Sequence, residues 1–448
     1  MEAIIELLWS ISKNKQILEV IRIYLVVIPL TFTCLVIASS PTIFRKDTFS
    51  EFLFQVLFVT SQLVLTFTVG AKIIYSVLSP LMAITFFISS LYFLRKWNKN
   101  GTLEILQIYM DDRPRSITFF RSSVDMITSC AILACDFKIF PHSFHKTRSF
   151  GVGLMDTGIG LFVFAMGVVS RPVTNKRALK SMITQVSVLL VLGIIRTVVL
   201  RTIHYSYDVN EYGRDFNSFI TLGLTKLIGA LLLSIIPAGV PILFSAIAAA
   251  VVHEGILQSG MGKYCLSKSV LRISFLEANR EGLISITGFV SIYLISVFIG
   301  SLISKDQRFN FECYKTMMLK LSAMSVISFI LTIFSVFTTD ISRRIANFGY
   351  ITWIVSLSTT LIITYSIALD VMLKAVHNND RSLPAIFEMV NFNGLIYFLT
   401  SNIFTGLVNI YLNPNEKSST EGICILIIYM ILPCMINRLL YVKRIRIS

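Results

Sequence analysis

Residues 134–156 read Ala-Cys-Asp-Phe-Lys-Ile-Phe-Pro-His-Ser-Phe-His-Lys-Thr-Arg-Ser-Phe-Gly-Val-Gly-Leu-Met-Asp, a short polar connection between two long apolar segments. Charged and titratable side chains gather in it, whereas Leu, Ile, Phe and Val dominate the sequence on both sides. The flanking segments, 117–136 and 151–170, each match the about 20 residues that a helix needs to cross the hydrocarbon core of a bilayer. This pattern predicts two membrane helices that are joined at a membrane edge, and it makes the connection the place where chemistry is expected.

The composition of the whole chain is that of a membrane protein. Of its 448 residues, 54% are hydrophobic and only 15% are charged, against about 25% charged residues in soluble domains. The net charge of +15 comes from Lys and Arg in short connections between apolar runs, not from one basic face. Anionic lipid headgroups explain this distribution better than nucleic acid does, so we expect the lipid bilayer as a partner and no nucleic acid.

The apolar runs predict an all-α fold, that of a polytopic membrane protein with about 13 transmembrane helices. The predicted spans are 21–40, 52–70, 73–94, 117–136, 151–170, 182–203, 217–236, 238–256, 283–303, 316–338, 349–370, 387–412 and 421–441. We therefore divide the chain into three parts. They are an N-terminal part with three transmembrane helices, 1–94, an amphipathic cytosolic linker, 95–116, and a main helical bundle that carries the site, 117–448.

The distribution of basic residues predicts an orientation. Connections rich in Lys and Arg stay on the cytosolic side of a membrane. The richest here are 95–115, 171–180 and the tail 443–446. An odd number of spans places the two termini on opposite sides, so we expect a cytosolic C-terminus and a lumenal 134–156 connection.

Charged side chains inside the apolar windows are further candidates. Each costs about 2.5–3.5 kcal/mol on insertion scales, so those that remain tend to be functional. Arg121 and Asp125 lie four residues apart and could equally pair with each other on one helix face. Arg196 is near enough to the end of its span for its guanidinium to reach the headgroups. Asp156 lies early in its span, and for Lys226, deep in its window, we predict a buried interhelical ion pair.

Several catalytic motifs are absent from the sequence. None of the five His residues is followed five positions later by Asp, which excludes the HxxxxD motif of glycerolipid acyltransferases. His253-Glu254 lacks the second His of a zinc-protease helix and the seven Cys form no CxxC pair, so no metal site is expected. The glycines of 151–153 and 158–160 fall within a predicted membrane helix. We interpret them as small residues that allow close helix packing.

The remaining candidate pair is Asp136 with Lys146, on either side of Pro141. Proline interrupts a continuous helix, so the chain can fold back between them. A partly buried carboxylate can act as a general base on an alcohol. A neighbouring ammonium can stabilise the oxyanion that forms when the alcohol attacks a thioester carbonyl. The two groups would suffice for acyl transfer, although on spacing alone an interfacial ion pair between them is the simpler interpretation.

The motifs around this pair resemble those of a known family. Asp136-Phe-Lys-Ile-Phe-Pro141 with Lys146, followed by Gly151-Val-Gly-Leu-Met-Asp-Thr-Gly-Ile-Gly160, is similar to the PIG-W type inositol acyltransferases of GPI-anchor biosynthesis. Further matches follow in the same order along the chain. They are Asn210-Glu-Tyr-Gly213, Glu277-Ala-Asn-Arg-Glu-Gly282, Ser342-Arg-Arg-Ile-Ala-Asn347, Asn391-Phe-Asn-Gly394 and Thr405-Gly-Leu-Val-Asn409.

The resemblance implies an enzyme of the endoplasmic reticulum membrane. Such an enzyme moves a fatty acyl group, typically palmitoyl, from acyl-CoA to the inositol ring of glucosaminyl-phosphatidylinositol. Acyl-CoA is then a co-substrate, and no cofactor is needed. The family's catalytic Asp and Lys fall on Asp136 and Lys146. This chain departs from the family in having His142-Ser-Phe-His145 where basic residues are common.

Four other residues are weaker candidates for contacts to phosphate or sugar hydroxyls: Arg196, Asn279, Arg280 and Asn393. Arg280 offers the bidentate geometry that phosphate favours. Helix capping and interface anchoring are equally good interpretations of all four.

Two other classes of function compete with the acyltransferase. A transporter of lipids or small molecules would often carry internal repeats and broken helices at the membrane midplane. We find no half-to-half repeat, and the polar cluster lies at a membrane edge. A non-catalytic scaffold would have no need for the arrangement of Asp136 and Lys146.

Overall fold

The computed structural model describes residues 14–39, 48–73, 114–202, 208–237, 240–267, 269–303, 311–372 and 383–447. The predicted span 73–94 lies outside these residues except for its first position. The predicted linker 95–116 also lies outside them, except for its last three residues. Of those three, Arg115 and Ser116 already belong to a membrane helix.

The described chain is helical throughout. Its α-helices are α2 (Lys15–Val27), α3 (Pro29–Ser39), α4 (Phe49–Phe67), α6 (Arg115–Ala134), α7 (Thr157–Gly167), α8 (Lys176–Thr202), α9 (Val209–Tyr212), α10 (Ser218–Ile235), α11 (Ile242–Ile256), α12 (Gly262–Leu266), α13 (Phe275–Ala278), α14 (Arg280–Ile303), α15 (Phe311–Thr338), α16 (Phe348–Ser366), α18 (Ala385–Phe392), α19 (Gly394–Leu412) and α20 (Ser419–Val442). Short 3-10 or π turns lie at η1 (Gly70–Lys72), η4 (His142–Phe144), η5 (Leu154–Asp156), η6 (Leu257–Met261), η7 (Ile367–Met372) and η8 (Pro414–Glu416). The prediction of an all-α fold is confirmed.

Eleven helices among the described residues are long and apolar enough to cross a membrane. Each coincides with one predicted span. Of the two other predicted spans, 73–94 lies outside the described residues, and 151–170 corresponds to the shorter apolar helix Leu154–Gly167. The window pattern therefore identified a polytopic membrane protein correctly.

One predicted span, 387–412, is divided in two. Helix α18 ends at Phe392 and α19 begins at Gly394, with Asn393 between them in a non-helical conformation. The Asn393 side chain donates a hydrogen bond to Ile445 O (2.9 Å) and accepts one from Ile447 N (2.8 Å). The break between α18 and α19 is thus the point at which the C-terminal tail is attached.

The glycine-rich start of the fifth predicted span is also not helical. Gly151 has φ +128°, and a Cβ on Gly153 would lie 2.2 Å from the carbonyl oxygen of His145. Both glycines are therefore needed for a tight loop, and the prediction of helix packing is wrong for them. It holds for Gly160, where a Cβ would lie 2.6 Å from the Ile354 side chain on α16.

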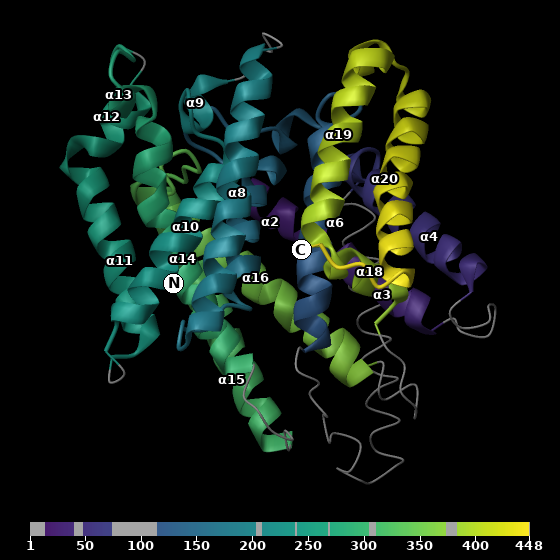
Figure 1. Ribbon diagram of the computed structural model, residues 1–448, viewed down its shortest axis with the longest axis horizontal. Coiled ribbons are helices and arrows are strands. Elements are labelled where there is room, and N and C mark those ends of the chain that lie inside the picture. The colour runs from purple at the N-terminus through teal and green to yellow at the C-terminus, as the bar shows by residue number, and fades with distance from the viewer. Residues whose placement is uncertain are drawn as a thin grey trace, which may run out of the picture.

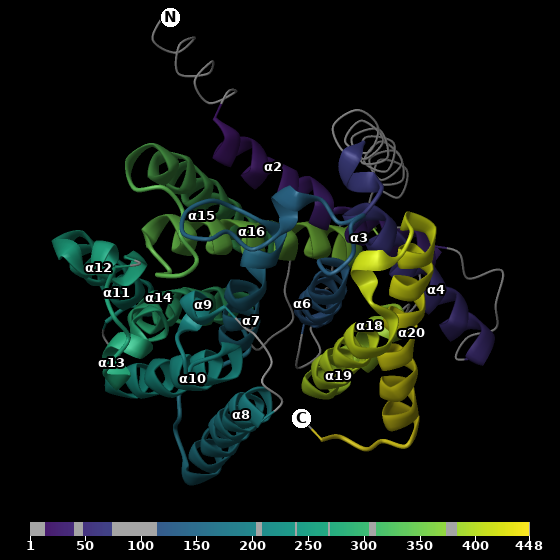
Figure 2. The same cartoon turned by 90° about the horizontal axis from the view of Figure 1, so that it is seen from above.

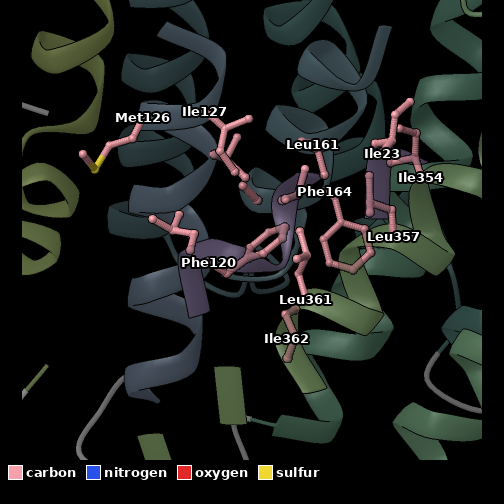
Figure 3. Close-up of a cluster of buried hydrophobic side chains, with 14 of the residues drawn as sticks. Ile23, Phe120, Met126, Ile127, Leu161, Phe164, Ile354, Leu357, Leu361 and Ile362 are labelled. Atoms are coloured by element: carbon pink, nitrogen blue, oxygen red, sulfur yellow. The ribbon is translucent and has the colours of Figure 1, made fainter. Parts of the chain in front are cut away.

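The most buried helices form the centre of the bundle. Of the residues in the most apolar stretch of each helix, 83% are buried in α6 and 78% in both α14 and α16, whereas only 11% are buried in α8. Figure 3 shows side chains of this core, among them Phe120 on α6, Phe164 on α7 and Leu357 on α16. Helices α8 and α10 lie on one side of α6 and α7, and α19 and α20 lie on the other (Figure 2). This leaves α8 as a helix whose apolar side chains face the lipid.

Four of the connections that carry family motifs meet at one end of the bundle, which we call the loop end (Figure 1). They are 135–153, 208–217, 269–279 and 339–347. Gly151 N donates to Ile341 O (2.8 Å), and Arg214 N donates to Ala278 O (3.0 Å). Helix α20 starts at the loop end and runs to the opposite end, the tail end, where residues 443–447 follow it. Stretches more than a hundred residues apart thus form one surface.

Candidate active site

Asp136 lies two residues after the end of α6, four positions after Ile132 and eight after Thr128. It is partly buried, and its carboxylate accepts a hydrogen bond from Asn409 Nδ2 on α19 (2.9 Å). The Cys135 thiol lies 3.6 Å from its other oxygen. The carboxylate is thus held in one orientation by a neutral amide, with no cation neutralising it among the described residues.

Lys146 lies in the same connection but pairs with a different residue. Its Nζ donates to Glu211 of α9 at 3.0 Å, and the side chain is 45% exposed. Asp136 and Lys146, both within the described chain, form no ion pair with each other, so the simpler interpretation from spacing is wrong. Burial and the Asp136 carboxylate raise the pKa of the Cys135 thiol to about 12, while the Lys146 ammonium acts in the opposite direction.

The two histidines between them pack on each other. The rings of His142 and His145 are stacked with centroids 5.3 Å apart, and His145 also contacts the Phe140 ring at 5.2 Å. Burial and the neighbouring His142 lower the pKa of His145, while Asp136 opposes this shift. The aromatic stack thus joins residues within the loop, and the Asp136 carboxylate acts electrostatically on His145.

Behind Lys146 is a buried network of charges. Arg343 donates to Glu211 Oε1 (3.0 Å) through Nη1 and to Asp156 Oδ1 (2.8 Å) through Nε. Asp156 is fully buried and also accepts from Thr147 N (3.1 Å). Burial opposes ionisation of Glu211, but Arg343 and Lys146 outweigh it and lower the pKa of Glu211 below its usual value. Glu211 therefore stays ionised between two cations and fixes Lys146 in place.

A second network holds the loop end together on the far side of Arg343. Glu281 is fully buried and accepts from Arg272 Nη2 (2.5 Å) and Arg344 Nη2 (3.0 Å). Arg344 also donates to the Arg148 carbonyl oxygen (2.8 Å). The loop 339–347 is thus joined to both the 135–153 connection and α14.

Glu211 and Arg343 were not among the residues predicted for the site. Both lie within stretches that carried the family resemblance, Asn210–Gly213 and Ser342–Asn347, and that was the signal available. The two residues are 132 positions apart. No spacing rule relates such positions, so only the fold brings them to Lys146.

A cavity of about 410 Å³ lies below this network, between α6, α7, α8, α10 and α19. Its rim at the loop end is polar and includes Lys146, Arg196, Asp208, Glu211 and Arg343. Its middle is apolar, with walls that include Phe162, Leu189, Phe219, Leu222 and Phe398. Asp136 is not one of the described lining residues, but Ala131 and Ile132, on the last turn before it, are. The site is therefore an apolar chamber within the membrane helices, with a charged opening.

The far part of the cavity is polar again. Arg121, Asp125, Gln185 and Lys226 line it, and Lys226 Nζ donates to the Gln185 side-chain oxygen across α10 and α8. The predicted interhelical contact of Lys226 exists, but the predicted ion pair is wrong because its partner is a neutral amide. An amide satisfies the ammonium without bringing a second charge into the membrane.

The four weaker candidates divide into two groups. Arg196 lines the cavity and acts electrostatically on Glu211. Asn279 exchanges hydrogen bonds with Asp215, and Arg280 donates to the Ser267 and Val270 carbonyl oxygens. Asn393 holds the C-terminal tail, as described above. Only Arg196 of the four lies on the cavity.

Replacing Arg343 by Met is expected to destabilise the protein by about 3–5 kcal/mol, because Asp156 would keep a buried charge without a cation. The loss is measured as a fall in the melting temperature of the detergent-purified protein. The double variant Asp156→Asn/Arg343→Met should recover part of it, since the amide carries no charge. Arg148→Gln, at an exposed position of the same end, is the control. An unchanged melting temperature for Arg343→Met would contradict this role.

Comparison with known proteins gives the family. Residues 10–440 match the family model of GWT1. GPI-anchored wall transfer protein 1 of Yarrowia lipolytica is 31% identical over 357 residues, which are 74% of this chain and 73% of that protein. The protein of the same name from Candida glabrata is 31% identical over 388 residues, 78% and 79% of the two chains. That of Schizosaccharomyces pombe is 29% identical over 333 residues, 72% of each. The resemblance drawn from the motifs is thus confirmed, and the chain belongs to the GWT1 family.

Proposed function

We propose that this protein is an O-acyltransferase of GPI-anchor biosynthesis in the endoplasmic reticulum membrane. It transfers a fatty acyl group, palmitoyl in the first instance, from acyl-CoA to the inositol ring of glucosaminyl-phosphatidylinositol. The names of its relatives support a place in the formation of GPI anchors. The observation that carries the proposal is an apolar chamber within the membrane helices whose charged opening includes Lys146 and whose wall includes Ile132, four residues before Asp136.

In this proposal Asp136 is the general base. Asn409 Nδ2 donates to one carboxylate oxygen and holds the group, and the other oxygen, next to the Cys135 thiol, would take the proton of the hydroxyl. As the inositol oxygen attacks the thioester carbonyl carbon, its proton passes to Asp136. The new carbon–oxygen bond forms, the carbon–sulfur bond breaks, and the proton leaves with the CoA thiol. Lys146 supplies the positive charge that stabilises the oxyanion between these two events.

The chamber suits the acyl chain. Its walls come from five helices and are aromatic or aliphatic in the middle, so a chain that enters there leaves water. The basic groups at the opening, Arg196 among them, suit the phosphates of the two substrates. We place the tail 443–447 in the cytosol because it is rich in Lys and Arg, and α20, which runs between the two ends of the bundle, then puts this opening and the 134–156 connection in the lumen.

The test is an assay of the purified protein with labelled palmitoyl-CoA and glucosaminyl-phosphatidylinositol. The proposal expects label in an inositol ester that mild base releases, together with one free CoA thiol per ester. A protein that binds the acceptor lipid but forms no ester, beside an active relative, would overturn it. Transport of the same lipid across proteoliposomes, without ester, would instead favour the transporter.

A narrower chamber is expected to change the preferred chain length. Ala165 on α7 lines the chamber, and replacement by Phe fills part of it. We expect Ala165→Phe to lower the rate with palmitoyl-CoA at least tenfold relative to a shorter acyl-CoA such as decanoyl-CoA, since a discrimination of 1–3 kcal/mol is about 10- to 200-fold. Ala165→Ser, of nearly the same size, is the control. An unchanged ratio of the two rates would show that the acyl chain lies elsewhere.

A further inference from the structure

A second pocket lies at the tail end of the bundle, far from Asp136. It has a volume of about 600 Å³. Its walls come from the start of α4, from α18, from the end of α20 and from the tail that folds back after α20. Its lining includes the basic residues Arg438, Arg444 and Arg446 and the apolar residues Phe52, Met389 and Phe392. Three guanidinium groups thus share one concave site with an apolar wall.

The charge of the pocket favours an anion. Glu51 is the acidic residue among its described lining, and it already accepts a hydrogen bond from Gln55 Nε2 (3.3 Å). Arg438 lies over the rings of Phe49 (4.7 Å) and Phe52 (4.6 Å), which fix its position without neutralising it. Its Nη1 is buried and has no hydrogen-bond partner in the described part of the chain. A buried guanidinium nitrogen without an acceptor is a site that an anionic oxygen can satisfy.

The tail is built into the pocket by specific contacts. Arg444 N donates to Tyr441 O (2.9 Å), and Ile445 N donates to Leu440 O (2.9 Å). These two bonds and the left-handed conformation of Arg444, with φ +53°, form a Schellman motif that reverses the chain after α20. Asn393 then clamps Ile445 and Ile447. Arg446 is thereby held 5.8 Å from the Phe392 ring.

The residue at the reversal is not the one that backbone geometry favours. Glycine is usual at a left-handed position after a helix, because side chains are strained there. The chain has Arg444 instead. A basic tail that served only to fix the orientation in the membrane would need neither this strained turn nor the Asn393 clamp. A strained position that carries a charge into a pocket suggests a function for that charge.

From these observations we infer that the pocket between α4, α18, α20 and the tail binds the phosphate of an anionic phospholipid headgroup. Arg438, Arg444 and Arg446 bind the phosphate oxygens, because guanidinium groups form paired, charge-assisted hydrogen bonds with phosphate. Phe52, Met389 and Phe392 contact the apolar part of the lipid. The tail end of a transmembrane bundle lies at the depth of the headgroups, so the lipid can reach the pocket from the bilayer.

The turn at Arg444 gives an unusually clean test. Arg444→Gly removes the charge but puts the favoured residue at the left-handed position, so the variant keeps or improves its stability. Binding is measured on the detergent-purified protein as the saturable rise in melting temperature with short-chain phosphatidic acid, which lacks the inositol ring of the proposed acceptor. We expect Arg444→Gly and Arg438→Gln each to weaken binding about tenfold, the loss typical of one charge-assisted hydrogen bond. Arg177→Gln, which removes an exposed charge at the start of α8, should bind as the parent does.

Two further ligands separate the sources of phosphate. Short-chain phosphatidylcholine and inorganic phosphate should each bind at least tenfold more weakly than the anionic lipid, as judged by the concentration that gives half of the rise in melting temperature. Equal binding of phosphatidylcholine, or equal binding by Arg444→Gly and the parent, would overturn the inference. If inorganic phosphate raises the melting temperature at the same concentrations as the anionic lipid, the occupant of the pocket is free phosphate and not a lipid. Acyl transfer is assayed at the other end of the bundle, so its outcome and that of this test are independent.

Discussion

Asp136→Asn is expected to lower the rate of acyl transfer by about 10²- to 10⁴-fold, the contribution typical of a general base. Asparagine has nearly the same shape and still accepts the hydrogen bond that Asn409 Nδ2 donates at 2.9 Å in the parent. It cannot take a proton from the inositol hydroxyl. The loss should therefore appear in the rate of the chemical step, while binding of the acceptor lipid and the melting temperature stay close to those of the parent.

The measurement needs two comparisons. Single-turnover transfer from labelled palmitoyl-CoA separates the chemical step from substrate binding and product release. Glu416→Gln removes an exposed carboxylate at the same end of the bundle and should leave the rate unchanged. If Asp136→Asn transfers the acyl group at the rate of the parent, Asp136 is not the base. If Asp136→Asn also lowers the melting temperature substantially, the loss of rate would come from a structural role of the residue instead.

The membrane architecture could be predicted from the sequence because its signal is local. A helix that crosses the bilayer must satisfy its own backbone and present about 20 apolar residues, so each window can be recognised alone. Where prediction failed, a contact from a distant part of the chain was responsible. Asn393, at the break in a predicted span, binds the tail 52 residues further on. The loop at Gly151 is held by Ile341, 190 residues further on, whose carbonyl oxygen accepts a hydrogen bond from Gly151 N (2.8 Å).

The site could be predicted only in part, for the same reason. Asp136 and Lys146 share one connection, and this made them visible as a pair. Their actual partners, Asn409 and Glu211, are 273 and 65 residues away. Motif resemblance drew attention to both stretches without giving either residue a role. Spacing also suggested that Asp136 and Lys146 neutralise each other, whereas the fold gives each a separate partner.

That separation matters for the second large effect, which concerns Lys146. An Asp136–Lys146 ion pair would hold the proton acceptor next to a permanent cation and weaken it as a base. In the structure Glu211 takes Lys146 instead, at 3.0 Å, and Arg343 balances the charge of Glu211 from behind. In the proposed mechanism Lys146 therefore acts from the rim of the cavity, and Asp136, which is paired with no cation among the described residues, takes the proton of the hydroxyl.

Lys146→Met is therefore expected to lower the rate of transfer by about 10²- to 10³-fold, the loss typical of a missing oxyanion donor. Lys146→Arg keeps the charge and should retain more of the rate. Glu211→Gln keeps Lys146 but removes its anchor, and we expect a smaller loss of rate together with lower stability. Equal rates for Lys146→Met and the parent would refute the oxyanion role.

The stability difference between the parent and Glu211→Gln should also depend on pH. Burial alone would raise the pKa of Glu211, but Arg343 and Lys146 lower it below its usual value of 4.5. A carboxylate with a lowered pKa in the folded protein stabilises the fold above its unfolded pKa, and this contribution is lost as the pH falls through the folded pKa. Glutamine makes no such contribution at any pH. The melting temperatures of the two proteins should therefore differ most near neutral pH and converge below about pH 4.5. A difference that stays constant over this range would mean that Glu211 anchors Lys146 by shape and not by charge.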